Sequence, residues 1–466
     1  MQQQTPIVVW DALMGSGKTT KIIDYMTDAS KSNNLLSCDN DLFIYCAPYI
    51  EELHSIAGTK IDDCNDNKEP VLNEDGSYFY KDKPQASLQF KHPNNKNKDG
   101  SKITGFKSLL DARHNVVTTH TLLGMLDAED LGVYKDYTLI IDEALIAYEG
   151  DYTLKSKTLE RYIENDVISF KDDGITLQFN REHFANLDGK PSDYDSTKDT
   201  ELEQFAKDCD KGLLYKFGGK VIKKFDVEVL KAFKKVMLLT YMFEGSMFSL
   251  LLKQHNIDYE IEYFGKTVES VRDLITINGE KRMNKVGAYG LKTDGSIDFR
   301  KHSLTSSHYS KERIKTNKDY NKTNVIMHNH LYNMWMQREK IAPERRLWTS
   351  FTDDKSSISK GKANVSRFHP SHIAFNTKAT NKYFKTDHLA YLVNVFIDSN
   401  YIKAASVDGF KLSQDHYALN TLIQWVWRSA IRDNKPIDLY IPSERMRDLL
   451  EAWLYHGYIP TYQEGK

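Results

Sequence analysis

The chain has little cysteine, little proline and no long apolar run. Its 466 residues include 4 cysteines and 11 prolines. The cysteines form no C-x-x-C pair, so we expect reduced thiols and neither a structural zinc site nor a disulfide framework. No apolar run approaches the ~18 residues that a membrane-spanning helix needs. Because the first residues also lack the basic and apolar regions of a secretory signal, we expect a cytoplasmic protein with no membrane partner.

An excess of charge of one sign is also absent. Lysine and arginine total 63 against 65 aspartate and glutamate residues, which gives a formal net charge of −2. The chain therefore lacks the global basic signature of nucleic-acid-binding proteins, although a local groove can be basic within a neutral protein. A hydrophobic content of 40% with 12% aromatic residues is typical of a folded protein, and the length fits two or three domains.

Short apolar runs alternate with amphipathic stretches along the chain. Strands separated by helices are typical of βαβ units and predict an α/β fold with parallel sheets. We expect two successive domains, 1–245 and 246–466, with the boundary near Gly245. The first set of expected strands is 7–10, 42–47, 115–119, 137–141 and 236–240. The second set is 259–264, 346–351, 372–376 and 437–441, with amphipathic helical stretches at 325–337, 389–396 and 417–431.

Polar stretches interrupt the first domain. Residues 62–105 are rich in Asn, Asp, Lys and Gly, and residues 180–211 are similarly polar within a wider insertion expected over 150–230. Either stretch could contact a partner. Their composition favours solvated excursions from the surface.

The most informative segment is Asp-Ala-Leu-Met-Gly-Ser-Gly-Lys-Thr-Thr at 11–20, directly after the expected strand 7–10. It follows the phosphate-binding pattern G-x-x-x-x-G-K-[ST], with Ala12 in place of the first glycine. A plain glycine turn is the alternative, which the strand before the loop and the helix after it disfavour. The sequence therefore predicts a nucleoside triphosphate site formed by Met14, Gly15, Ser16, Gly17, Lys18, Thr19 and Thr20.

The chemistry of phosphate binding explains these residue types. Gly15 and Gly17 allow backbone N–H groups to close around phosphate oxygens without a Cβ atom in the way. The helix that follows points its positive end at the same anion. We expect Lys18 to reach the β- and γ-phosphates and the Thr19 hydroxyl to ligate Mg²⁺.

The apolar strand expected at 137–141 ends in two carboxylates. Asp142 is placed to hold Mg²⁺ beside the phosphate loop, and Glu143 suits the role of base or positioner for the attacking water. An acidic pair after a strand is also a common start of a loop, but its place downstream of a phosphate loop favours catalysis. Since a small-molecule kinase protects the γ-phosphate from water, the pair indicates hydrolysis.

A third segment, 424–432, reads Gln-Trp-Val-Trp-Arg-Ser-Ala-Ile-Arg. Gln424, Arg428 and Arg432 fall at i, i+4 and i+8, so we expect them along one helix face. Two arginines stacked in this way could reach the charge that develops on the transferring γ-phosphoryl group. The alternative is an amphipathic helix whose tryptophans pack while its arginines are solvated. The two preceding motifs favour the catalytic interpretation.

Together these segments resemble the superfamily 2 helicases, the class of DEAD- and DEAH-box motors with two RecA-like domains. Residues 12–19 match the A-x-x-G-x-G-K-T form of motif I in that class. Residues 141–145 resemble its D-E-A-x motif II, and 424–432 resemble Q-x-x-G-R-x-x-R of motif VI with Trp427 in place of glycine. The resemblance spans 6–445, with weaker similarities at 43–49, 116–121, 238–242, 346–351 and 373–381. The departures, such as Thr-Tyr-Met in motif III, suggest a phage or mobile-element member.

The resemblance implies a helicase or translocase that hydrolyses ATP with Mg²⁺ in the cleft between two RecA-like domains. Its partner would be nucleic acid, with DNA favoured over RNA and single strands or forks as substrates, in the host cytoplasm beside replication or recombination proteins. Strand-end hydroxyls and backbone N–H groups contact phosphates without reading sequence. Ordinary capping of strand ends would explain each such residue equally well. The candidates are Pro48, Thr118, Thr119, His120, Thr349, Ser350, Thr377 and Thr380.

Three other classes of protein share part of this pattern. A viral packaging motor also carries a phosphate loop and an acidic strand end, but it normally has a nuclease domain, for which the segment after Arg432 is too short. An ATP-switched nucleic-acid-binding protein without unwinding activity is the second class. A degenerate, inactive relative is the third, which the presence of all four central residues disfavours. These four are Lys18, Thr19, Asp142 and Glu143.

Overall fold

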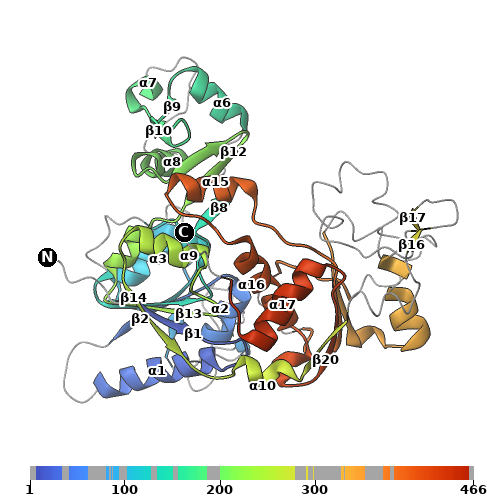
Figure 1. The fold of residues 1–466 in the computed structure, drawn as a ribbon. Helices are drawn as coiled ribbons and strands as arrows, with labels where there is room; N and C mark the ends of the chain where they lie inside the picture. The colour runs from blue at the N-terminus through green and yellow to red at the C-terminus, as the bar shows by residue number, and fades with distance from the viewer. Residues whose placement is uncertain are drawn as a thin grey trace, which may run out of the picture.

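Two parallel sheets form the centre of the molecule, the first built from strands between residues 7 and 263 and the second from strands between residues 275 and 440 (Figure 1). We call the part built on the first sheet the first domain and the part built on the second sheet the second domain. The computed structural model describes residues 7–33, 41–60, 80–82, 86, 88–93, 102–126, 134–150, 156–185, 200–278, 290–291, 297–298, 327–329, 331–351, 371–377 and 382–460.

The first sheet has seven strands in the order β14-β1-β13-β7-β2-β6-β5, and all its pairings are parallel. Strand β2 is buried along its whole length, as expected for a central parallel strand that is covered on both faces. The strands are β1 (Ile7–Asp11), β2 (Leu42–Ala47), β5 (Phe90–Lys91), β6 (Asn115–Thr119), β7 (Tyr137–Asp142), β13 (Lys235–Thr240) and β14 (Tyr259–Tyr263).

Helices cover both faces of the first sheet. On one face, α1 (Lys18–Asn33) and α2 (Ile50–Ala57) share a core with Trp10, Phe43 and Ile140. On the other face, α3 (Lys102–Asp111) and α9 (Met247–Gln254) pack against the alternate residues of the same strands. The short helix α4 (His120–Leu123) follows β6 directly.

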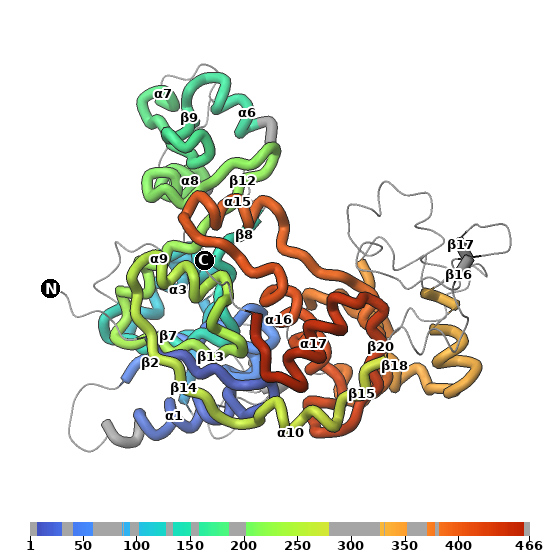
Figure 2. The backbone as a smooth tube through the Cα atoms, viewed as in Figure 1, coloured from blue at the N-terminus to red at the C-terminus, as the bar shows by residue number. Residues whose placement is uncertain are grey.

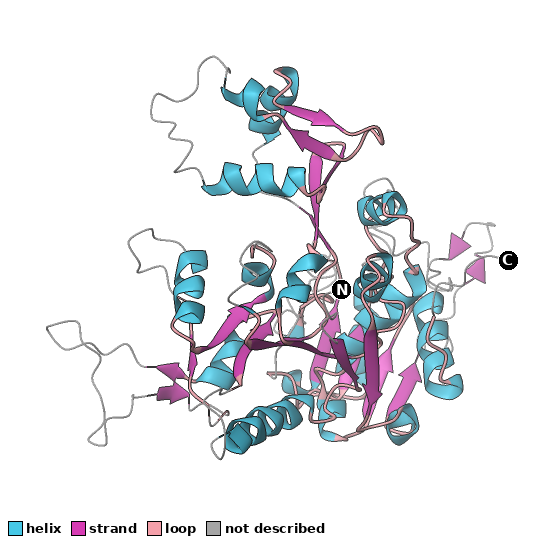
Figure 3. Ribbon diagram, turned by 90° about the vertical axis from the view of Figure 1, so that its left-hand side faces the viewer, coloured by secondary structure: helices cyan, strands magenta, loops and turns pink. Residues whose placement is uncertain are grey.

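A small subdomain, which we call the inserted subdomain, is built from Tyr148 to Lys224. Its base, with Tyr148 and Tyr215, shares the core of the first sheet, and its outer part projects away from both sheets (Figures 2 and 3). Its core includes Leu159, Leu177 and Phe205. The described part of the insertion expected over 150–230 is therefore a folded unit, although the stretch 186–199 lies outside the described residues. Its elements are β8 (Tyr148–Gly150), α6 (Ser156–Glu164), β9 (Ile168–Phe170), β10 (Leu177–Phe179), α7 (Arg181–Ala185), α8 (Thr200–Asp210), β11 (Leu214–Phe217) and β12 (Lys220–Lys224).

The other polar stretch, 62–105, lies largely outside the described residues. Its described part contains two short strands: β4 (Tyr80–Asp82), which pairs with β3 (Thr59–Lys60) just before the stretch, and β5, which joins the edge of the first sheet. No described helix is long and apolar enough to cross a membrane.

The second sheet has four parallel strands in the order β15-β20-β19-β18. Leu389 and Tyr391 on β19 face a core shared with the helices α16 and α17, whereas Ala390 packs with Trp335 on the opposite face. The elements are α10 (Val268–Arg272), β15 (Ile275–Asn278), a π-helix at Tyr332–Arg338, β18 (Arg346–Thr349), β19 (His388–Tyr391), α15 (Ser399–Val407), α16 (Gln414–Val426), β20 (Ile437–Tyr440) and α17 (Glu444–His456).

Helix α15 of the second domain packs against the first domain. Ala404 and Ala405 belong to the core of the first sheet, and Asp408, just after the helix, accepts three hydrogen bonds from the inserted subdomain. The donors are the Tyr148 hydroxyl at 2.6 Å, the Tyr215 hydroxyl at 2.7 Å and the Lys224 ammonium at 2.7 Å. Figure 1 shows α15 between the inserted subdomain and the rest of the molecule.

The structure confirms the predicted α/β fold with two successive parallel sheets and corrects three details. Strand β14 pairs with β1, so the first sheet extends past the boundary expected near Gly245. The expected strand 372–376 contributes only an isolated bridge between His372 and Trp348. The expected helix 389–396 begins instead as β19. Every residue there except the last is buried, and periodicity alone does not separate a buried strand from a buried helix.

Candidate functional site

The phosphate loop starts from a buried carboxylate at the end of β1. Asp11 is 7% exposed and accepts hydrogen bonds from the backbone N–H groups of Met242 at 2.9 Å and Phe243 at 2.8 Å. These bonds tie the first residue of the loop to the segment after β13. Sequence reasoning assigned Asp11 no role. A carboxylate in the last position of the strand was the available signal.

The loop itself has the backbone that phosphate binding requires. Gly15 and Gly17 have φ of 75° and 81°, which lie in the left-handed region that favours glycine. Lys18 begins α1, and its ammonium group donates to the carbonyl oxygen of Ala12. Met14 to Gly17 form the turn, and Thr19 and Thr20 lie in the first turn of the helix. Burial lowers the pKa of Lys18 to about 8, an effect that the nearby carboxylates, Asp142 first among them, oppose.

Asp142 lies at the end of β7, separated from β1 by β13 alone. The Tyr45 hydroxyl donates to its Oδ2 at 2.6 Å, and Nε2 of His120 lies 2.9 Å from its backbone oxygen. Burial raises the pKa of Asp142 to about 6, and the Tyr45 hydrogen bond is the strongest opposing influence. Sequence reasoning missed Tyr45, whose only signal was a hydroxyl-bearing ring in an otherwise apolar strand.

Glu143 has an unusual backbone. Its φ is 63°, a region that is uncommon for residues other than glycine. Its N–H donates to the carbonyl oxygen of Leu239 at 2.8 Å, so β13 holds the strained residue in place. Backbone strain of this kind costs of order 1–3 kcal/mol and concentrates at functional sites.

The arginines of the third motif do not share one helix face as expected. Helix α16 ends at Val426, and Arg432 lies in a separate 3-10 helix at Ala430–Asp433. Gln424 donates to Oδ1 of Asn420 at 2.8 Å and accepts from Nε of Arg428, at 3.3 Å, through its backbone oxygen. The prediction of a shared helix face from the i, i+4, i+8 spacing was wrong because the helix ends before Arg428.

Both arginines nevertheless lie at the site of the first domain. Arg428 is 7% exposed, and its Nη1 atom is buried without a hydrogen-bond partner among the described residues. Burial lowers the pKa of Arg428, and the negative charge of Glu143 is the first influence that opposes it. Arg432 covers Gly15: its backbone oxygen and Cγ lie 3.3 Å and 3.5 Å from where a Cβ atom on that glycine would stand.

These residues fit a triphosphate and Mg²⁺. The glycine backbone leaves room, since a Cβ atom on Gly17 would meet no atom within 4 Å, and the unpartnered Nη1 of Arg428 suits an anion. Among the described residues, no three or more His, Cys, Asp or Glu side chains are grouped to hold a metal ion. Mg²⁺ bound to a nucleotide needs only one or two carboxylates besides phosphate oxygens, which Asp142 and the Thr19 hydroxyl would complement.

The candidate nucleic-acid contacts are placed less favourably. Thr118, Thr349 and Ser350 are 1%, 0% and 2% exposed, so these residues at or just after strand ends are buried and do not present their hydroxyls at the surface. Thr119 caps α4 by accepting from the N–H of Leu122 at 3.3 Å. Of the remaining candidates, Pro48, His120 and Thr377 are half-buried, and Thr380 lies outside the described residues.

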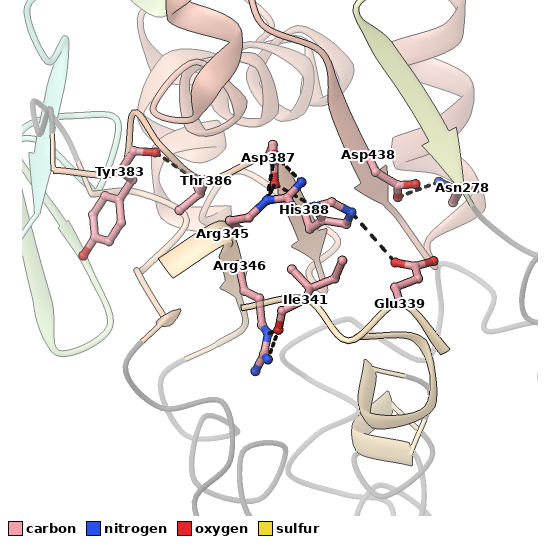
Figure 4. Close-up of polar contacts among 10 residues, drawn as sticks. All are labelled: Asn278, Glu339, Ile341, Arg345, Arg346, Tyr383, Thr386, Asp387, His388 and Asp438. Carbon is pink, nitrogen blue, oxygen red and sulfur yellow. Dashed lines mark hydrogen bonds and ion pairs between the residues drawn. The ribbon is translucent and has the colours of Figure 1, made fainter. Parts of the chain in front are cut away.

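A separate charged network lies at the amino ends of β18 and β19 (Figure 4). The guanidinium of Arg345 donates to both carboxylate oxygens of Asp387, at 2.7 and 3.0 Å, and Nδ1 of His388 lies 2.7 Å from the same carboxylate. Because β18 begins at Arg346 and β19 at His388, the network joins the starts of neighbouring strands. We assign it to the stability of the second sheet.

Comparison with known proteins relates the chain to a prophage protein. Residues 269–454 match the family model described as the YonV C-terminal Rossmann-like domain. The chain is similar to YonV along almost its whole length. It is 29% identical over 459 residues to the SPbeta prophage-derived uncharacterized protein YonV of Bacillus subtilis (strain 168), a match that covers 96% of this chain and 98% of that protein. The matched domain contains the whole second sheet, and its description agrees with the parallel α/β architecture.

Solved structures of three helicases are similar at low scores. The DUF1998 helicase MrfA bound to DNA has a TM-score of 0.36 at 9% identity, covering 98% of this chain and 47% of that one, so the chain spans about half its length. A DEAD box protein from Methanococcus jannaschii has a TM-score of 0.28 at 12% identity, covering 97% and 86%. The helicase domain of Pyrococcus furiosus Hef has a TM-score of 0.30 at 10% identity, covering 98% and 95%. At these scores the likeness says nothing about activity.

Proposed function

We propose that the protein is an ATP-dependent nucleic-acid motor of the superfamily 2 helicase type. The observation that carries the proposal is the meeting of the two domains at the phosphate loop. Arg432 covers Gly15, and the negative charge of Glu143 in the first domain attracts the guanidinium of Arg428 in the second. An ATPase whose site needs both domains can couple hydrolysis to their relative movement.

Each residue then has a defined task. Lys18 and the backbone of the phosphate loop bind the triphosphate, while Asp142 and the Thr19 hydroxyl would hold Mg²⁺, which neutralises charge on the phosphate oxygens. Glu143 accepts a proton from the attacking water. Arg428 and Arg432 stabilise the charge that develops on the γ-phosphoryl group.

The proposed partner is nucleic acid, with DNA favoured over RNA and single strands or forks as substrates. This part rests on the resemblance of the three motifs to helicases. The prophage origin of the similar YonV fits a phage or mobile-element protein, which would work in the host cytoplasm with replication or recombination proteins.

One assay tests the proposal directly. ATP hydrolysis is measured with no nucleic acid, and then with single-stranded, duplex and forked DNA and the matching RNAs. We expect hydrolysis that single-stranded or forked DNA stimulates and that Lys18→Ala abolishes. Displacement of a labelled strand from the fork is measured in parallel.

The other outcomes separate the alternatives. Stimulation by duplex DNA without strand displacement would favour a packaging-type motor. Tight nucleic-acid binding that responds to ATP without turnover would indicate an ATP-switched binding protein. Absence of both ATP binding and hydrolysis would contradict the proposal altogether.

A further inference from the structure

A cavity of about 580 Å³ adjoins the phosphate loop on the side of β14. Its walls come from the start of the loop at Asp11 to Leu13, from the segment after β13 with Tyr241, Met242 and Glu244, from 263–269 and from Ile459 near the end of the described chain. A space of this size is in the range of ligand pockets in proteins. No residue of the proposed hydrolytic step other than the loop itself lines it.

The order of the sheet gives the cavity its place along a bound nucleotide. Asp142 on β7 lies on one side of β1, and β14 is the neighbour of β1 on the other side. If the γ-phosphate faces Asp142 and Arg428, a triphosphate that crosses the phosphate loop has its nucleoside end on the β14 side. The cavity therefore lies where the base and ribose of that nucleotide need room.

The wall of the cavity that contains Gly265 and Lys266 contacts the phosphate loop directly. The Lys266 N–H donates to Oγ of Ser16 at 3.0 Å, and its ammonium donates to the backbone oxygen of Arg432 at 3.2 Å. Gly265 has a φ of 82°, and a Cβ atom there would lie 2.4 Å from Cβ of Ser16. Such close packing means that the cavity keeps its position relative to the phosphate-binding backbone.

Tyr263 supplies an aromatic surface at the mouth of this cavity. It is the last residue of β14, it pairs in register with Asp11, and it is 71% exposed. A large ring with that exposure at the rim of a pocket is suited to stacking on a planar base, because every base presents a π-face. Tyr241 on the inner wall is held in place, since its hydroxyl accepts from Nε1 of Trp453 at 2.9 Å.

We propose that this cavity binds the nucleoside of the triphosphate, with the base stacked on the ring of Tyr263. The inference rests on the proposed function and deepens it. It assigns base recognition to the segment that begins with the last residue of β14, Tyr263 to Val268, instead of to residues upstream of the phosphate loop.

The test compares ATP with inorganic tripolyphosphate, which has the phosphates but no nucleoside. Binding of each to the full chain is measured by calorimetry for the wild type, Tyr263→Ala, Tyr263→Phe and, as a control, Phe170→Ala in the inserted subdomain. We expect Tyr263→Ala to weaken ATP binding by about 10-fold or more, the scale of a lost base stack, and to leave tripolyphosphate binding unchanged. Tyr263→Phe should retain ATP binding, and Phe170→Ala should match the wild type for both ligands.

Contrary outcomes have distinct meanings. Unchanged ATP binding in Tyr263→Ala, or an equal loss for ATP and tripolyphosphate, would overturn the inference while leaving the proposed function in place. Binding of neither ligand by the folded wild type would overturn the proposed function and this inference with it. Because the Tyr263 side chain is mostly exposed, the substitution removes little packing.

Discussion

The backbone oxygen of Arg432 lies 3.3 Å from the position that a Cβ atom on Gly15 would take. A residue of the second domain is thus in contact with the phosphate loop of the first. Any residue with a side chain at position 15 would meet Arg432, and its backbone would also have to adopt a φ of 75°. The contact between domains and the shape of the loop therefore depend on the same glycine.

The two arginines should control turnover more than binding. Arg428→Ala or Arg432→Ala is expected to slow ATP hydrolysis by ~10³-fold or more, the scale attributed to arginine fingers, while ATP binding weakens far less. Lysine should not restore full activity at either position, because a point charge does not reproduce the planar guanidinium fork. Steady-state kinetics, with Arg181→Ala in the inserted subdomain as the control, measures the effect. Near-normal turnover in both variants would show that these arginines are structural.

Binding and hydrolysis should separate in a second pair of variants. Lys18→Ala is expected to abolish ATPase activity through loss of the phosphate contact. Glu143→Gln should keep most of the nucleotide affinity while hydrolysis falls by ~10²-fold or more, because the general base is lost. Nucleotide titration and single-turnover hydrolysis measure the two quantities, with the exposed neighbour Glu149→Gln as the control. Equal loss of nucleotide binding in Lys18→Ala and Glu143→Gln would show that the role of Glu143 is wrong.

Asp142 should trade stability for function. Burial raises its pKa from 3.8 to about 6, so folding favours the protonated form. This contribution to the free energy of unfolding is fully present below about pH 4 and is lost as the pH rises through about 6. In Asp142→Asn the side chain at this position never ionises. The substitution should therefore raise the free energy of unfolding of the metal-free protein at pH 8 by on the order of 1 kcal/mol, and its Tm should rise accordingly.

The same variant provides the check on that explanation. The gain in Tm should shrink at pH 5, where wild-type Asp142 is largely protonated, and hydrolysis should be lost at every pH. The attraction of Lys18 for the charged carboxylate lowers the pKa of Asp142 and is therefore already contained in the value of about 6. A variant that is destabilised equally at pH 5 and pH 8 would contradict the explanation.

Affinity for nucleic acid should fall steeply with salt. Counterions released from the phosphates drive most non-specific binding, and contacts to the backbone carry little information about sequence. Titrations of labelled single strands of different sequence at several salt concentrations, with a non-hydrolysable ATP analogue present, measure both properties. A flat salt response, or no binding, would remove nucleic acid as the partner.

The fold and the geometry of the phosphate loop were largely predictable because their signals are local. A glycine loop between a strand and a helix, and a carboxylate pair after a buried strand, are complete within a few residues. Tyr45 and Asp11 were not predictable in the same way. Their roles depend on partners far along the chain, at Asp142 and at Met242 and Phe243.

The structure of the second domain was harder to predict from the sequence, for two physical reasons. β19, one of its two inner strands, is buried on both faces and loses the alternation that marks a strand. In the segment from Gln424 to Arg432, the side-chain spacing suggested a helix that in fact ends at Val426. Sequence spacing predicted that the arginines act together, but only the folded chain shows that Arg428 reaches the first domain from the turn after α16 and Arg432 from the following 3-10 helix.

The carboxylate of Asp408 joins the second domain to the inserted subdomain. It accepts hydrogen bonds from two tyrosines and a lysine of the inserted subdomain, while the helix before it packs in the core of the first sheet. A separation of the second domain from the first would therefore have to break these hydrogen bonds and withdraw the helix from that core. The three parts of the molecule are fastened to one another at a point distant in sequence from the phosphate loop.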